Sequence, residues 1–234
     1  MEVSPSLLND PRSEHLSAAA RRLLRRPRPR FRGLLHRWAT IASIPLGVVA
    51  AFVADGSRGT TAMVIFAVGA TLMLGISAVV HLRDWPIERV ELLIRLDHSA
   101  IFVMYATSAT PIALMALTGR QATIVLAFAY GGMVGGVVAE FLPFHPPRGV
   151  VNTIYITFGL SFLVFIPWLL AGLSTTQFVI LMIGGGFYAG GSIIVGAQWP
   201  DPWTDTFGYH EIWHVFVVVG AGCHYWLAMD LVTL

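Results

Sequence analysis

The chain has no lysine, a single cysteine and few charged residues. All fifteen of its basic residues are arginine, and the four charged residue types together make up only 12% of the sequence. A soluble domain carries roughly 25% charged residues, so this composition excludes an ordinary soluble protein. The lone cysteine, Cys223, excludes an intramolecular disulfide, and its place in an apolar helical pattern favours a packing role.

Apolar residues dominate what is present. They make up 56% of the chain, and the mean hydropathy is +0.70. Segments that cross about 30 Å of hydrocarbon as helices, at about 1.5 Å per residue, occur seven times. They cover residues 38–54, 61–80, 99–117, 122–142, 150–173, 178–197 and 212–234. The sequence therefore predicts an all-α, multi-pass integral membrane protein with seven transmembrane helices and no separate soluble domain.

The basic residues are concentrated at the start of the chain, where nine arginines fall between Arg12 and Arg37. Residues 1–37 are expected to form a basic, flexible tail, with an amphipathic piece over 21–37 at the membrane surface, and residues 38–234 the membrane domain. The arginines predict a cytoplasmic N-terminus and contact with anionic lipid headgroups, and we expect no nucleic-acid partner. The first span lies behind this segment and is expected to remain in the mature protein.

Seven spans that start inside leave the C-terminus outside and put the loops 81–98, 143–149 and 198–211 in the cytoplasm. Four arginines fall in these loops, against Arg58 and Arg120 in the outer ones, in agreement with the positive-inside rule. Glycines crowd the fourth and sixth segments, where we expect close helix packing. Pro111 and Pro167 lie inside spans and are expected to kink or loosen them.

This topology brings unusual polar residues to one membrane face. Ser77 and His81 end the second helix, Asp97 and His98 begin the third, and the seventh begins with the motif His210-Glu211-Ile212-Trp213-His214. Ionisable groups in a membrane segment cost free energy unless they are paired or used, which favours a functional site.

Histidines four residues apart lie on one face of a helix, one turn apart, so His210 and His214 are able to bind one metal ion. With His81 they supply three nitrogen ligands and leave one position open, as in catalytic zinc sites. Asp97 is then a candidate base or orienting group, and Ser77 a hydrogen-bonding group.

Other titratable residues are expected to lie outside this site. His36, His98 and His145 are interpreted as interfacial or supporting residues, and Glu140 as a charge that faces a loop. His224 lies about 15 Å further along the seventh helix than His214, at about 1.5 Å per residue, and is too distant to share its metal.

Three motifs, Ser77-x-x-x-His81, Arg95-Leu96-Asp97-His98-Ser99-Ala100-Ile101-Phe102 and His210-Glu211-Ile212-Trp213-His214, resemble those of the hemolysin III family, within the progestin and adiponectin receptor superfamily. The resemblance covers residues 32–234. It implies a seven-helix fold, zinc held by His81, His210 and His214, and Asp97 and Ser77 beside the metal. Related superfamily members, the ceramidases among them, are regarded as lipid amide hydrolases, and the bacterial members imply a bacterial plasma membrane.

The first helix departs from the family pattern of glutamate, asparagine, threonine and histidine, because this chain has only Arg32-Gly33-Leu34-Leu35-His36 there.

The leading functional hypothesis is therefore a zinc-dependent hydrolase of a lipid amide or ester, with Asp97 as base. A second hypothesis takes His210-Glu211-x-x-His214 as a metalloprotease helix with Glu211 as base, but Asp230 lies too far along the helix to complete that site. A third is a receptor, transporter or pore in which zinc is structural or regulatory. A haem held by paired histidines is a further alternative.

Overall fold

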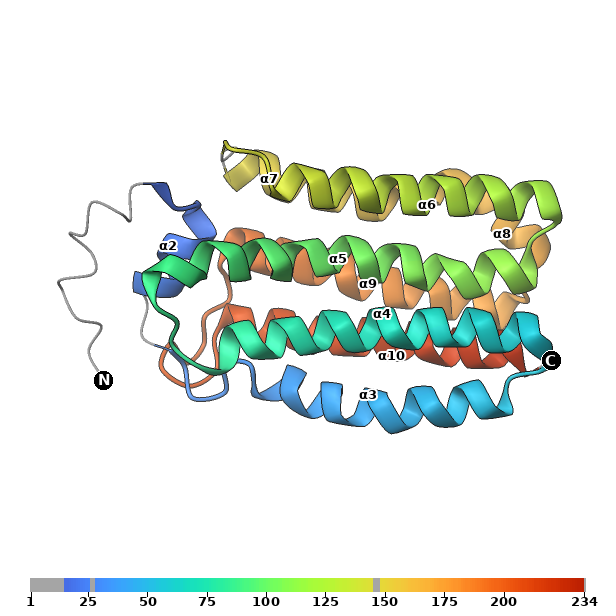
Figure 1. Ribbon diagram of the computed structural model, residues 1–234, viewed down its shortest axis with the longest axis horizontal. Helices are drawn as coiled ribbons and strands as arrows, with labels where there is room; N and C mark the ends of the chain where they lie inside the picture. Colours follow the sequence, from blue (N-terminus) through green and yellow to red (C-terminus); the bar gives the residue numbers. More distant parts are fainter. Residues whose placement is uncertain (1–14, 26–27, 145–147, 234) are drawn as a thin grey trace.

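The chain folds into a bundle of long helices (Figure 1). The computed structural model describes residues 15–25, 28–144 and 148–233. Within them the elements are α2 (Ala18–Arg25), α3 (Leu34–Val53), α4 (Gly56–Leu82), α5 (Ile87–Ala116), α6 (Gly119–Glu140), α7 (Arg148–Leu160), the 3₁₀ helix η2 (Ser161–Phe165), α8 (Ile166–Gly172), α9 (Thr175–Ala197) and α10 (Tyr209–Val232).

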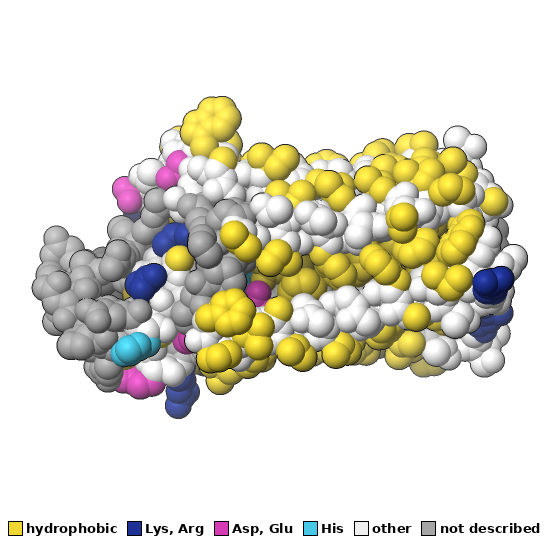
Figure 2. Space-filling model, turned by 90° about the horizontal axis from the view of Figure 1, so that it is seen from above, with side chains coloured by type: hydrophobic (Ala, Val, Ile, Leu, Met, Phe, Trp, Pro, Cys, Tyr) yellow, Lys and Arg dark blue, Asp and Glu magenta, His cyan; other side chains and the backbone are white. Residues whose placement is uncertain are grey.

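Seven spans in the described part of the chain are long and apolar enough to cross a membrane. Six are the single helices α3 to α6, α9 and α10, and the fifth span in chain order combines α7, η2 and α8 over Thr153–Gly172. Each contains most of one predicted segment, so the seven-helix prediction is confirmed. Figure 2 shows apolar side chains over the middle of one face and charged ones towards its two ends, as expected of a bundle that sits in a bilayer.

The third span begins earlier than predicted. The prediction placed a loop at 81–98, whereas α5 starts at Ile87, directly after Pro86. Proline suits the first positions of a helix, and an i,i+4 pair between Glu91 and Arg95 (Nε to Oε1, 2.8 Å) stabilises the polar turns that hydropathy excluded. Asp97 therefore lies inside a helix rather than at its start, which the prediction had wrong.

The two prolines inside spans behave differently. Pro167 is the second residue of α8, which follows η2, the short 3₁₀ stretch that interrupts the fifth span, so the predicted loosening is present there. The helix α5, by contrast, continues through the buried Pro111 to Ala116.

The glycines of α6 and α9 serve two purposes. A Cβ at Gly136 would lie 2.3 Å from Phe102, and one at Gly191 would lie 2.5 Å from Trp213, so the predicted packing role is confirmed for these two. At Gly135, Gly185 and Gly186 a Cβ would meet nothing within 4 Å. These three border open space instead of a neighbouring helix.

The N-terminal region is folded where the structure describes it. Leu16 and Ala20 are buried in a cluster with Val80, Val90 and other apolar residues of α4 and α5. The flexible tail expected over residues 1–37 is therefore wrong for residues 15–25, because the apolar face of α2 packs on the bundle. Figure 1 shows α2 at the end of the bundle opposite the C-terminus, and we call this the α2 end.

Candidate metal centre

Three histidines meet at the α2 end of the bundle. His81 lies in the last turn of α4, and His210 and His214 lie one turn apart at the start of α10. The start of α10 is fixed locally, because the Asp201 carboxylate accepts a hydrogen bond from the Tyr209 amide (3.2 Å). The predicted placement of all three histidines is confirmed.

Their geometry suits a metal ion. The Nε2 atoms of His81 and His210 are 3.3 Å apart, and one ligand nitrogen of each of the three histidines lies within 4.8 Å of the others. Two nitrogens of a tetrahedral zinc site with bonds of about 2.0–2.1 Å lie about 3.3 Å apart. The rings of His81 and His214 are buried and His210 is half-buried. The donor set therefore suits zinc in its chemistry, and the His81–His210 pair has the spacing of two ligands of one ion.

Asp97 and Ser77 lie beside this cluster. The Asp97 Oδ2 atom is 3.4 Å from His81 Nε2, and the buried Ser77 hydroxyl lies close enough to interact with the same carboxylate. Both residues therefore lie where the sequence placed them relative to His81. Their catalytic roles stay predictions.

His36 lies against the cluster, in the supporting position that was one of the two predicted for it. Its ring stacks on that of His214, with 3.9 Å between centroids and an interplanar angle of 11°. It is 2% exposed, and neither ring nitrogen has a hydrogen-bond partner among the described residues. This ring restricts the orientation of His214.

Gly33 explains how His36 reaches the centre. Its φ of 75° lies in the left-handed region, and a Cβ there would be 2.8 Å from the His81 backbone. Only glycine allows both this conformation and this approach without strain. The turn before α3 therefore lies directly against the end of α4, and His36 follows within one turn.

Glu211 is committed to contacts other than a metal or substrate. One carboxylate oxygen pairs with the Arg32 guanidinium, and the other accepts a hydrogen bond from the Gly208 amide (2.8 Å). The side chain is 3% exposed. Glu211 therefore fixes the start of α10 and connects it to the segment before α3, which argues against its use as a protease base.

A second ion pair holds the same segment. The Arg28 guanidinium lies 3.1 Å from the Asp84 carboxylate, in the turn after α4. The pKa of Arg28 is lowered from its ordinary value, because the effect of burial outweighs the opposite effect of the Asp84 carboxylate. The buried Arg32 pair thus fixes the segment before α3 to the start of α10, and the exposed Arg28 pair adds a weaker contact with the turn after α4.

A cavity of about 760 Å³ extends from the histidine cluster into the bundle. His36, Ser77, His81, Asp97 and His210 line it at one end. Further along, its walls are mainly apolar and include Phe102, Ile112, Leu169 and Leu181. The cluster therefore faces a space that suits a hydrocarbon chain.

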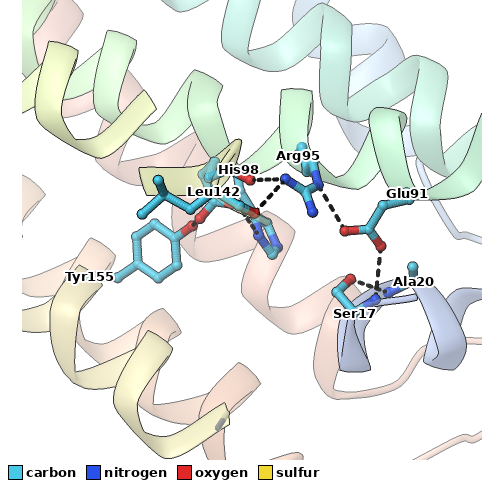
Figure 3. A network of polar contacts seen from close by, with 8 residues as sticks. Ser17, Ala20, Glu91, Arg95, His98, Leu142 and Tyr155 are labelled. Atoms are coloured by element: carbon cyan, nitrogen blue, oxygen red, sulfur yellow. Dashed lines mark hydrogen bonds and ion pairs between the residues drawn. The ribbon is translucent and has the colours of Figure 1, made fainter. Parts of the chain in front are cut away.

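A second polar network borders the cavity (Figure 3). His98 Nδ1 lies 3.3 Å from Glu140 Oε2, and the Tyr155 hydroxyl donates to the other Glu140 oxygen. Arg95 donates to the Glu140 carbonyl (2.7 Å) and to Glu91 (2.8 Å). Glu140 is thus paired inside the bundle, so the prediction of a loop-facing charge was wrong. His98, on α5, supports this network through its contact with Glu140. His145 lies outside the described residues.

The far end of α10 takes no part in the metal cluster. Within the described ranges, the three histidines are the one group of His, Cys, Asp and Glu side chains close enough to share an ion. Asp230 accepts a hydrogen bond from Gln177 (2.7 Å), and His224 packs edge-on against Tyr188. The predicted exclusion of His224 and Asp230 from the centre is confirmed.

Comparison with known proteins gives a family match over most of the chain. Residues 24–225 match the family described as "Haemolysin-III related". Hemolysin-3 of Bacillus cereus is 28% identical over 193 residues, which cover 80% of this chain and 84% of that protein.

Two further relatives extend this comparison. A hemolysin-3 homolog of Bacillus subtilis is 29% identical over 136 residues, which cover 57% of this chain and 60% of that protein. The heptahelical transmembrane protein ADIPOR2 of Oryza sativa subsp. japonica is 31% identical over 183 residues, which cover 71% of this chain and 80% of the rice protein. The similarity thus reaches both bacterial hemolysin-3 proteins and a plant heptahelical transmembrane protein.

Proposed function

This chain belongs to the haemolysin-III-related family, and from that premise we propose that it is a zinc-dependent hydrolase of a lipid amide or ester. The observation that supports the proposal best is the position of His81, His210 and His214, with Asp97 beside them, at one end of a largely apolar cavity. A hydrolytic centre that opens into such a cavity suits a substrate that is itself a bilayer component.

Zinc is the proposed ion because three imidazole nitrogens at this spacing leave one position open. Zinc bound there would supply Lewis acidity that polarises a carbonyl and activates water. His36, stacked on His214, keeps that ligand in the orientation the cluster requires.

Asp97 is the proposed base. Its carboxylate lies next to His81 and borders the cavity, so it is placed to accept a proton from the attacking water and return it to the leaving amine or alkoxide. The proposed role of the buried Ser77 hydroxyl, which lies beside this carboxylate, is to set its orientation. In the overall reaction, the water oxygen forms a bond to the carbonyl carbon and the C–N or C–O bond breaks.

The proposed partners are lipids. The cavity holds the chain of the substrate, and the arginines of α2 and the following segment contact anionic headgroups. We place the protein in a bacterial plasma membrane with the α2 end in the cytoplasm, in accordance with its arginine distribution and its Bacillus relatives.

Metal analysis combined with a lipid panel tests this function. Purified protein should contain about one zinc per chain, and His81→Ala and His214→Ala should lose most of it. A matched control is His15→Ala, an exposed histidine before α2. Full zinc retention in both ligand variants would exclude the site.

Hydrolysis is measured on the same preparations with a panel of long-chain amides and esters. Asp97→Asn should lower kcat by about 100-fold or more, the typical contribution of a positioned base. Asp55→Asn, at the opposite end of the bundle, should leave the rate unchanged. If no member of the panel is cleaved although zinc is present, the receptor, transporter or pore hypothesis replaces the hydrolase.

A further inference from the structure

Three polar groups lie deep in the cavity, away from the histidine cluster and without a part in the proposed hydrolysis. They are Ser108 on α5, Tyr188 on α9 and His224 on α10, and all three line the cavity. Polar side chains in the apolar part of a membrane protein are costly and mark sites of use.

The three groups lie at a common depth. Ser108 is eleven residues beyond Asp97 on α5, and His224 is ten residues beyond His214 on α10. Tyr188 is ten residues before Gln198, whose side chain donates to the Tyr209 hydroxyl at the start of α10 (3.0 Å). At about 1.5 Å per residue, each lies about 15 Å from the metal centre.

Two of the three are positioned by glycines on the facing helix. The Tyr188 and His224 rings meet edge-on, 5.3 Å apart between centroids. A Cβ at Gly184 would lie 2.6 Å from the His224 ring, and one at Gly220 would lie 3.0 Å from the Tyr188 ring. The glycines let both rings fit between α9 and α10 beside the cavity.

Their polar atoms are buried without partners. Among the described residues, the Ser108 hydroxyl, the Tyr188 hydroxyl and both ring nitrogens of His224 make no hydrogen bond of normal geometry, although the His224 ring lies near the Leu181 carbonyl. The Tyr105 hydroxyl, on the same cavity wall, has a partner in Ser161 at 3.3 Å. An unsatisfied buried polar group is costly, so three of them at one depth point to a ligand that satisfies them.

We propose that Ser108, Tyr188 and His224 form a second polar subsite, which binds a hydroxyl or keto oxygen on the lipid chain in the cavity. The inference rests on the proposed function in one respect, namely that the cavity holds a lipid chain. An extended chain advances about 1.2 Å per bond, so a depth of about 15 Å corresponds to an oxygen about a dozen bonds from the reacting carbonyl. The preferred ligands are lipids with an oxygenated mid-chain carbon.

The test measures binding, not turnover, and uses three free acids of equal chain length. Octadecanoic acid, 2-hydroxyoctadecanoic acid and 12-hydroxyoctadecanoic acid compete with a fluorescent fatty acid for the purified full-length protein in nanodiscs. We expect the 12-hydroxy acid to bind about two- to tenfold more tightly than octadecanoic acid, the usual gain from one hydrogen bond. The 2-hydroxy acid should show no such gain.

Tyr188→Phe and Ser108→Ala should reduce this preference while leaving the affinity for octadecanoic acid unchanged. The matched control is Tyr225→Phe, because the Tyr225 hydroxyl donates to the Leu46 carbonyl outside the cavity (3.0 Å); it should keep the full preference. Equal affinity for all three acids, or a preference that survives in Tyr188→Phe and Ser108→Ala, would overturn the subsite alone. Failure of every acid to bind would instead contradict the lipid cavity on which the proposed function depends.

Discussion

At the scale of single residues, His36 lies against the candidate metal centre without being one of its three clustered histidines. It packs parallel to His214 at 3.9 Å and is shielded from solvent by the bundle. A flat ring in this position limits the rotation of the His214 imidazole. Groups that orient a metal ligand typically change metal affinity by about 10- to 100-fold.

We therefore expect His36→Ala to weaken zinc binding by about tenfold. His36→Phe keeps a flat ring and should retain most of the affinity. Zinc affinity is measured by competition with a chromogenic chelator. If His36→Ala binds zinc as tightly as the unsubstituted protein, stacking does not orient the ligand.

The pair of Arg32 and Glu211 leads to a prediction about stability. Removal of one partner leaves a buried charge without compensation, which costs about 3–5 kcal/mol in buried pairs. Arg32→Met and Glu211→Gln should therefore each lower the thermal unfolding temperature in detergent. The double variant Arg32→Met/Glu211→Leu should recover much of the loss, since no unpaired charge remains.

The same variants separate a structural from a catalytic role of Glu211. Folded Glu211→Gln protein should retain zinc and hydrolytic rate per molecule. Loss of hydrolysis in Glu211→Gln at an unchanged unfolding temperature, with Asp97→Asn still active, would favour the metalloprotease hypothesis instead.

The residues of the centre differ in how far the sequence determines them. Helical periodicity and a common membrane face were sufficient to group His81, His210 and His214. Arg32 and Glu211 are 179 residues apart, and no local pattern relates them. His36 depends on the close contact of Gly33 with the end of α4, which only the folded chain displays.

At the scale of elements, α5 and α9 show the limits of hydropathy. Hydropathy predicts a loop for the charged turns at the start of α5, because some of their stabilising partners, such as Ser17 and the end of α6, come from elsewhere in the chain. In α9 the glycines suggested packing throughout, whereas Gly185 and Gly186 border the cavity. The sequence predicts where helices lie, but not which of their faces meet a neighbour.

Gly185 allows a direct test of the cavity. A Cβ at this position would meet no atom within 4 Å, so Gly185→Leu should fold normally and fill part of the cavity. If the new leucine side chain displaces two methylene groups of a bound chain, at about 0.8 kcal/mol each, the affinity for that chain should fall roughly tenfold. The measurement is the affinity of Gly185→Leu for octadecanoic acid, compared with that of the unsubstituted protein.

The matched control is Gly131→Leu. A Cβ at Gly131 also meets nothing within 4 Å, but this glycine is not among the residues that line the cavity. Gly131→Leu should bind octadecanoic acid with the affinity of the unsubstituted protein. Equal binding by both variants would show that the chain does not pass Gly185.

At the scale of the whole molecule, we propose that the seven candidate spans in the described part of the chain all cross the bilayer, which would put the two ends of the bundle's chain on opposite sides. Arginines concentrate at the α2 end, which we propose to be cytoplasmic. Single cysteines introduced on a Cys223→Ala background report the orientation. In intact cells, a membrane-impermeant maleimide should label Arg120→Cys, whereas Asp84→Cys should react only after permeabilisation. The opposite pattern would reverse the proposed topology.

The proposed hydrolysis inside the cavity of the bundle predicts how turnover should depend on substrate supply. A lipid that enters it is dissolved in the bilayer, so its effective concentration is a mole fraction of the membrane, not an amount per volume of buffer. Dilution of the substrate with an inert phospholipid at constant bulk concentration should therefore slow the reaction, whereas dilution of the whole proteoliposome suspension should leave the rate per molecule unchanged.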